Sequence, residues 1–186
     1  MTKVAALGPR GSFSEKAARK HFKRSENLGI VYAKSFSEIF DLVETGKANY
    51  GVVPLEDSNE GDICQPEDTL VLLKDSTLYM VGEEYLNVNH NLFGKGSEND
   101  IKVIATHPKI LSHCKDFIKN YFPDVQKMAV QSSAEGARLA SENPSYGAIG
   151  DKRLAEIYGL NILRREVHDK GQQVTRFAVV GKKENL

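Results

Sequence analysis

The stretch TRFAVV, from Thr175 to Val180, decides the fold of this chain. Its β-branched and aromatic residues are typical of a buried strand. The residues after it, GKKENL, carry no helical pattern. A strand without a following helix breaks the order of the preceding chain, so we expect this strand to return to the sheet formed by the first part of the chain.

Strand-like runs alternate with amphipathic helical patterns through most of the sequence. The strand-like runs are Val4–Leu7, Leu28–Ala33, Tyr50–Val53, Val103–Thr106, Val125–Val130 and Gly147–Ile149. The helical patterns are Phe13–Lys23, Phe36–Thr45, Pro108–Tyr121, Ala134–Glu142 and Asp151–Tyr158. This alternation predicts an α/β fold with largely parallel sheets. Ser35 followed by Glu38 predicts a capped helix start, and Gly159 a helix end.

The segment from Ser76 to Phe93 has β character and no helical pattern, and a new series of strands and helices starts at Val103. We interpret the segment as a crossing between two lobes. The expected lobes are residues 1–77 plus 170–186 and residues 78–169, with a cleft between them.

Composition excludes several classes of partner. The 186 residues include 25 basic and 25 acidic side chains, and 40% are hydrophobic. No basic block exceeds pairs such as Arg164-Arg165, so we expect neither nucleic acid nor a membrane as partner. No apolar run reaches the roughly 20 residues that span a bilayer, and no leader pattern precedes the first strand. We therefore expect a cytoplasmic protein that binds a small molecule or another protein.

Cys64 and Cys114 are isolated cysteines without metal-ligand spacing, so we expect neither a metal site nor a disulfide framework. Cys114 follows His113 in a predicted helix, and His107 lies in the turn before that helix. A Cys/His nucleophile pair is one interpretation. Packing of a buried thiol is the commoner one, and we assign no catalysis to this cysteine.

The stretch ALGPRGSFSEKAARKHF, from Ala6 to Phe22, reads as a strand, a glycine-rich turn and a helix start. Free N–H groups at a helix start bind anions, and the hydroxyls of Ser12 and Ser14 add donors. The motif is neither a P-loop nor a dinucleotide fingerprint. The simpler alternative is that Ser12 only caps the helix.

Two further segments place polar groups at element ends. The side chain of Arg176 is expected on the face of its strand opposite to that of Thr175 and Phe177. It is either a solvated residue or, if it lies in a cleft, a ligand for a carboxylate. Ser132 and Ser133 start a helix after a strand, so they are helix caps or a second anion contact.

In their order along the chain, these segments resemble the prephenate dehydratase family. GPRGSFSEKAA is similar to that family's GPxGTFSExAA, and GVVPLEDSNEG to its VVPxENSxxG. THPKILSHC, SSAEGA and VTRFAVV are similar to its HPQALxQC, STAxAA and TRF motifs. The resemblance covers essentially the entire chain. It implies a two-lobed, periplasmic-binding-protein-like fold with the active site between the lobes.

The resemblance also implies a reaction and a set of site residues. Members convert prephenate to phenylpyruvate with loss of carbon dioxide and water, and need no organic cofactor or metal. Thr175 would donate to the departing ring hydroxyl, and Arg176 would bind a substrate carboxylate. The implied substrate-binding residues are Gly11, Ser12, Phe13, Ser14, Asp57, Ser58, Gly61, Ser133, Ala134, Gln173 and Phe177.

The sequence departs from the family pattern where substrate contact is implied. Asp57 and Gln173 replace asparagines, and GDICQPEDTL replaces the usual GSVxxTLD continuation. An ionised Asp57 cannot donate a hydrogen bond and would repel a dianion. It must be protonated or paired, or the ligand is not prephenate in the usual pose.

Three functions follow from this pattern. They are prephenate dehydratase, a diverged enzyme that acts on arogenate or only decarboxylates prephenate, and a noncatalytic small-molecule binding module. The retained Thr175 argues against the decarboxylase, whereas Asp57 would suit the amino group of arogenate. The family's C-terminal regulatory ACT domain is not represented, so we expect a catalytic unit without that route of feedback. We also expect a homodimer or a higher homo-oligomer.

Overall fold

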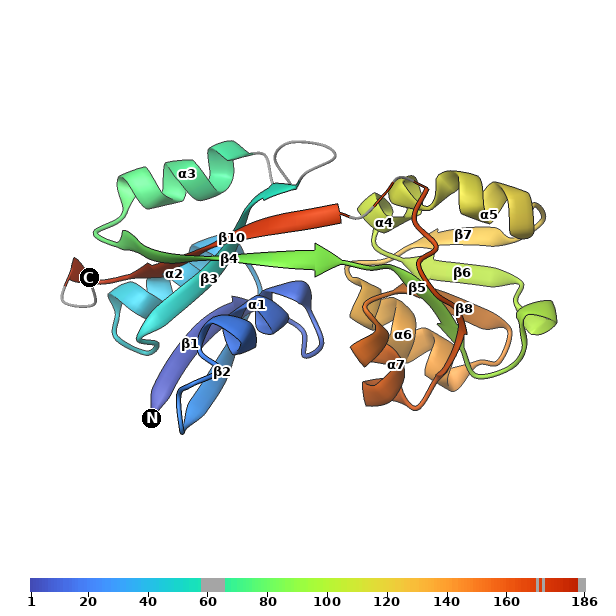
Figure 1. Ribbon diagram of the computed structural model, residues 1–186, viewed down its shortest axis with the longest axis horizontal. Coiled ribbons are helices and arrows are strands. Elements are labelled where there is room, and N and C mark those ends of the chain that lie inside the picture. The colour runs from blue at the N-terminus through green and yellow to red at the C-terminus, as the bar shows by residue number, and fades with distance from the viewer. Residues whose placement is uncertain (58–65, 170, 172, 184–186) are drawn as a thin grey trace. The chain divides into compact units, whose positions relative to one another are not determined.

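The computed structural model describes residues 1–57, 66–169, 171 and 173–183, with the backbone alone for residues 56, 57 and 66–68. The chain divides into two compact α/β units (Figure 1). Unit 1 consists of Met1–Asn87 and Gln173–Leu186, and unit 2 of Val88–Gln172. Unit 1 extends to Asn87 rather than to residue 77, because strand β4 (Tyr79–Val88) lies in its sheet.

Unit 1 is built on a five-stranded sheet of order β2-β1-β3-β10-β4. Its other elements are β1 (Thr2–Leu7), α1 (Phe13–His21), β2 (Leu28–Ala33), α2 (Phe36–Glu44), β3 (Tyr50–Asp57), α3 (Pro66–Asp75) and β10 (Gln173–Gly181). β10 lies between β3 and β4, so the final strand returns to the first sheet. That expectation from the sequence is confirmed.

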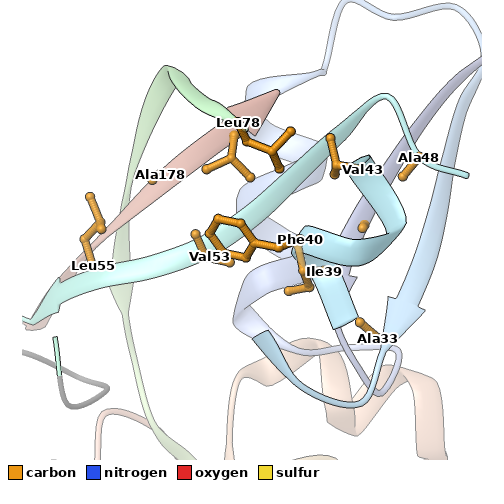
Figure 2. Close-up of a cluster of buried hydrophobic side chains, with 11 residues drawn as sticks. Ala33, Ile39, Phe40, Val43, Ala48, Val53, Leu55, Leu78 and Ala178 are labelled. Carbon is orange, nitrogen blue, oxygen red and sulfur yellow. The ribbon is translucent and has the colours of Figure 1, made fainter. Parts of the chain in front are cut away.

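Helices cover both faces of this sheet. Phe177 and Val179 of β10 pack with residues of α1 in one hydrophobic cluster. The alternate residues, Ala178 and Val180, belong to a second cluster with residues of α2. Figure 2 shows this cluster, with Ala178 labelled beside α2 residues such as Phe40. Leu72 and Leu73 of α3 pack against it. Because strand side chains alternate between faces, β10 contributes to both cores.

Unit 2 repeats the three-layer arrangement on a sheet of order β7-β6-β8-β5-β9. Its elements are β5 (Asn91–Gly94), a 3-10 turn η1 (Glu98–Asp100), β6 (Val103–Thr106), α4 (Pro108–His113), α5 (Lys115–Tyr121), β7 (Gln126–Ala129), α6 (Ser133–Glu142), β8 (Tyr146–Gly150), α7 (Lys152–Tyr158) and β9 (Asn161–Arg164). Ile149 packs toward α4 and α5, and Ala148 toward α6 and α7.

Both sheets are mixed, which corrects the expectation of largely parallel sheets. β10 runs antiparallel to β3, and β5 runs antiparallel to β8 and to β9. α3 and β9 are elements that the alternating pattern does not predict. The helix expected over Pro108–Tyr121 is two helices, because the backbone of Cys114 leaves the helical region at φ −114° and ψ 22°.

The predicted helix caps are confirmed. The Glu38 N–H donates to Ser35 Oγ at 3.1 Å, and the Lys34 N–H donates to Glu38 Oε2 at 2.7 Å. Gly159 ends α7 with φ +63°, a conformation that favours glycine.

Gly51, the second residue of β3, has no room for a side chain. A Cβ atom there would lie 2.5 Å from Ile39 Cγ2 and 2.9 Å from Val180 Cγ2. We expect Gly51→Ala to lower the free energy of unfolding by about 1–3 kcal/mol through overpacking. Urea denaturation measures the change. Gly171→Ala is the matched control, because a Cβ there meets no described atom within 4 Å; equal effects of both substitutions would contradict the prediction.

Candidate active site

The residues predicted to bind substrate lie in both units. Unit 1 contains Gly11–Ser14, Asp57, Gln173 and Thr175–Phe177, and unit 2 contains Ser133 and Ala134. Ser58 and Gly61 lie outside the described residues.

Strand direction brings most of the unit 1 residues to one edge of the sheet. β1 and β3 run parallel. β10 runs antiparallel to β3, so the start of β10 lies beside the end of β3, and Thr175 pairs with Asp57. The turn from Gly11 to Ser14 follows β1 at the same edge. This is the edge at which open α/β sheets bind ligands.

Thr175 is buried on the face of the sheet that α1 covers. Only 3% of Thr175 and 2% of Phe177 is exposed. Phe177 packs in one cluster with Ala17 and Ala18 of α1. The pairing of β10 with β3 shifts register between Arg176 and Phe177. Burial still alternates along β10, because Arg176 is more exposed than Thr175 and Phe177 on either side of it. Thr175 therefore lies on the same face as Phe177, at the edge where α1 begins.

Gln173 lies two residues before Thr175 and is 2% exposed. Its Oε1 atom meets no hydrogen-bond donor among the residues that the structure describes. A buried amide oxygen without a donor is unfavourable by about 1–3 kcal/mol. A hydrogen-bond donor added beside this oxygen would therefore form a stabilising bond.

Arg176 binds a carboxylate of the protein itself. Its Nε and Nη2 atoms donate to the two oxygens of Glu83 in β4, at 3.2 and 2.5 Å. Hydrogen bonds from Arg176 and then from Tyr85 hold the pKa of Glu83 below its usual value. A substrate carboxylate at Arg176 would compete with Glu83, and the role of Arg176 toward substrate stays a prediction.

Ser12 caps α1 as predicted. Its Oγ accepts a hydrogen bond from the Glu15 N–H at 3.2 Å and donates to the Leu7 carbonyl oxygen at 2.7 Å. Gly11 has φ +91°, which favours glycine. The hydroxyl of Ser12 thus has two structural roles at the cap, as an acceptor for Glu15 and as a donor to Leu7.

Glu15 occupies the backbone donor of Gly11, a residue predicted to bind substrate. The Gly11 N–H donates to Glu15 Oε2 at 2.6 Å, and Arg19 Nε donates to Glu15 Oε1 at 2.7 Å. Burial alone would raise the pKa of Glu15, but hydrogen bonds from Gly11, Arg19 and Tyr32 outweigh burial and hold this pKa below its usual value. The sequence did not single out Glu15, although Ser12 and Glu15 have the same spacing as Ser35 and Glu38.

In unit 2, Ser132 caps α6, and its Oγ accepts from the Glu135 N–H at 3.1 Å. Ser133 is the first residue of α6 and lies against Gly150 at the end of β8, where an added Cβ would be 2.9 Å from Ser133 Cβ. Ala134 is 2% exposed and packs in the core. Its side chain therefore faces the protein, which leaves its backbone as the group for a ligand contact.

Cys114 is fully buried at the junction of α4 and α5. Burial, with a smaller effect of Asp169, raises the pKa of its thiol to about 12. The rings of His113 and His168 lie near that of buried His90, with centroids 5.9 and 6.4 Å from it. A protonated, buried thiol is a packing group, which agrees with assigning it no catalysis.

The described part of the chain contains neither a metal-binding cluster nor a membrane-spanning helix. No group of three or more histidine, cysteine, aspartate or glutamate residues there could hold a metal ion. No described helix is both long and apolar enough to cross a membrane.

Comparison with known proteins identifies the family. The family model described as prephenate dehydratase matches residues 4–185. The chain is 36% identical over 182 residues to a bifunctional chorismate mutase/prephenate dehydratase of Neisseria gonorrhoeae, covering 96% of this chain and 49% of that protein. It is 36% identical over 178 residues to a prephenate dehydratase of Methanocaldococcus jannaschii, covering 94% and 63%. The chain belongs to the prephenate dehydratase family, and it spans about half of one relative and less than two thirds of the other.

Solved structures agree with the fold. A protein titled GqqA, a novel type of quorum quenching acylase, gives a TM-score of 0.83 at 26% identity, over 97% of this chain and 64% of that one. The prephenate dehydratase of Staphylococcus aureus gives 0.74 at 25% identity, over 100% and 68%. A nutrient binding protein from Burkholderia cenocepacia bound to methionine matches at the level of fold, with a TM-score of 0.53 at 11% identity, over 100% and 86%. The predicted α/β fold of the periplasmic-binding-protein type is confirmed.

The buried thiol gives a chemical test of the unit 2 core. In a Cys64→Ser variant, Cys114 is the only cysteine. We expect it to react with a disulfide reagent at pH 8 at least about a hundredfold more slowly in the native protein than in urea, because burial limits both access and the thiolate fraction. Absorbance of the released thiolate measures the rate. A Cys64→Ser/Cys114→Ser variant gives the background, and rapid native labelling would contradict the burial of Cys114.

Proposed function

We propose that this chain is a prephenate dehydratase, which converts prephenate to phenylpyruvate with loss of carbon dioxide and water in phenylalanine biosynthesis. One observation carries the proposal within a chain of this family: the hydroxyl-bearing Thr175 is buried beside the end of β3, on the face and edge where α1 begins. The family relationship supplies the reaction, and this position supplies a donor for it.

The proposed chemistry needs one donor and fixed positions for two carboxylates. The bond between the ring and its carboxylate breaks, and the electron pair enters the ring as carbon dioxide leaves. The ring C–O bond breaks, and the leaving hydroxide takes up one proton to become water. Thr175 donates a hydrogen bond to that oxygen, so its role is to stabilise charge that appears only as the bond breaks.

The remaining predicted residues bind the dianion in this proposal. The first turn of α1 carries the positive end of the helix dipole, which favours a bound anion. Ser14 and Phe13 are at that turn, and Ser133 occupies the corresponding position in α6. Gln173 contributes its amide near Thr175. Arg176 binds one carboxylate in exchange for Glu83.

Arogenate is the second candidate substrate, favoured by Asp57. The backbone of Asp57 pairs directly with Thr175, at a position where the family has asparagine. A carboxylate there would attract the ammonium group of arogenate and repel the carboxylates of prephenate.

Two properties of the whole protein are also proposed. The first is a cytoplasmic location, in keeping with a biosynthetic enzyme. The second is a homodimer, supported by exposed Tyr79, Met80 and Tyr85 on the edge strand β4. Sedimentation of the purified protein at micromolar concentration tests the second, and a monomer mass would reject it.

Removal of the Thr175 hydroxyl tests the reaction. We expect wild-type protein to form phenylpyruvate from prephenate, and Thr175→Ala to lower kcat by about 10²–10³-fold, as for loss of one transition-state donor. Thr175→Ser restores most of the rate because it keeps the hydroxyl. Products are identified by mass.

Thr69→Ala is the matched control for that experiment. Thr69 is also buried in unit 1, and its hydroxyl donates to the Pro54 carbonyl oxygen at 3.4 Å. Its loss should affect stability more than kcat. A product that has lost carbon dioxide but kept the ring hydroxyl, or binding of prephenate without turnover, would reject the dehydratase.

The Asp57→Asn variant separates the two substrates. We expect kcat/KM for prephenate to rise by about tenfold, because one like charge is removed and an amide donor is gained. We expect kcat/KM for arogenate to fall. Steady-state kinetics on both substrates measure the change, and a slower reaction with prephenate would mean that the Asp57 carboxylate assists it.

A further inference from the structure

We propose that Glu15 is a positioning residue, which fixes the Gly11–Ser14 turn by holding the Gly11 N–H and is itself neutralised by Arg19. The inference rests on the proposed function, because it concerns how the proposed substrate-binding turn is held. Gly11 then contributes to substrate binding through the shape of the turn. The hydrogen bond from its N–H to Glu15 fixes that shape.

The contacts of Glu15 fix the turn from two sides. Oε2 accepts from Gly11, before the helix, while the Glu15 N–H donates to Ser12 Oγ. The hydroxyl of Ser12 in turn donates to the carbonyl oxygen of Leu7, the last residue of β1. This chain of three hydrogen bonds ties the end of the strand to the start of the helix. The three bonds together restrict the shape of the turn.

The burial of Glu15 distinguishes this contact from ordinary helix capping. Glu38 holds the N–H of Lys34 at the start of α2 in the same way, at 2.7 Å. The Glu38 contact is exposed, whereas only 4% of the Glu15 side chain is exposed. A helix cap alone does not require a buried carboxylate, because a surface one forms the same bond.

Arg19 makes a carboxylate compatible with a site for a dianion. A bare negative charge beside the first turn of α1 would oppose the anion that the turn is proposed to bind. Arg19 Nε lies 2.7 Å from Glu15 Oε1 on the adjacent turn of α1. The charges of Glu15 and Arg19 nearly cancel at a distance, so the helix N–H groups remain the main source of the electric field at the turn.

Steady-state kinetics of four variants test the inference. We expect Glu15→Ala to raise KM for prephenate about tenfold with little change in kcat, since a turn that binds the carboxylate retained in the product contributes equally to ground and transition states. Glu15→Gln keeps an acceptor for Gly11 and raises KM less. Arg19→Met leaves the carboxylate unpaired and raises KM by about threefold to tenfold, less at high salt. Glu15→Gln/Arg19→Met removes both charges and returns KM to the value of Glu15→Gln.

Glu38→Ala is the matched control, because it removes the equivalent contact from α2, which packs on the opposite face of the sheet. Its KM should stay within about twofold of wild type, whatever its unfolding midpoint. If Glu15→Ala does not fold, the comparison of the charge variants still tests the inference. A KM for Glu15→Gln/Arg19→Met as high as that for Arg19→Met overturns it. Equal KM values for Glu15→Ala and Glu38→Ala also overturn it. Wild-type protein without turnover would reject the proposed function, and the inference with it.

Discussion

The antiparallel pairing of β10 with β3 is the contact on which unit 1 depends. The pairing runs from Thr175 opposite Asp57 to Gly181 opposite Tyr50 and joins segments more than a hundred residues apart. β10 supplies side chains to the hydrophobic clusters on both faces of the sheet. Because it runs antiparallel, β10 begins at the edge where the parallel strands end. The pairing of β10 with β3 therefore completes both hydrophobic clusters and positions Thr175 at the candidate site.

The two capped helices of unit 1 show how one local pattern serves two purposes. Ser12 with Glu15 and Ser35 with Glu38 have the same spacing, and each glutamate binds the N–H of the residue before the cap. The difference is burial: Glu15 is enclosed and paired with Arg19, whereas the Glu38 contact faces solvent. Tertiary packing decides which of the two caps is enclosed by the protein.

Sequence reasoning was most successful where local rules decide the outcome. Two strands, Leu28–Ala33 and Val103–Thr106, have the predicted bounds, and the caps at Ser12, Ser35 and Gly159 are present. α3 was missed because its apolar residues do not form one buried stripe; Leu70 and Val71 are exposed. The pairing of Arg176 with Glu83 joins residues 93 positions apart, and no local pattern specifies such a partner.

The charge arrangement of unit 1 suits a reaction in which a carboxylate is lost. Arg19 and Arg176 each bind a protein carboxylate, so the cations near the candidate site are already partly neutralised. In the proposed reaction the ring carboxylate leaves as neutral carbon dioxide, and its charge disperses in the transition state. A strong, unshared cation would stabilise that carboxylate more in the ground state than in the transition state and would slow the reaction. In this proposal, an arginine shared with Glu83, together with helix N–H groups and a neutral hydroxyl at Thr175, would hold the substrate without that penalty.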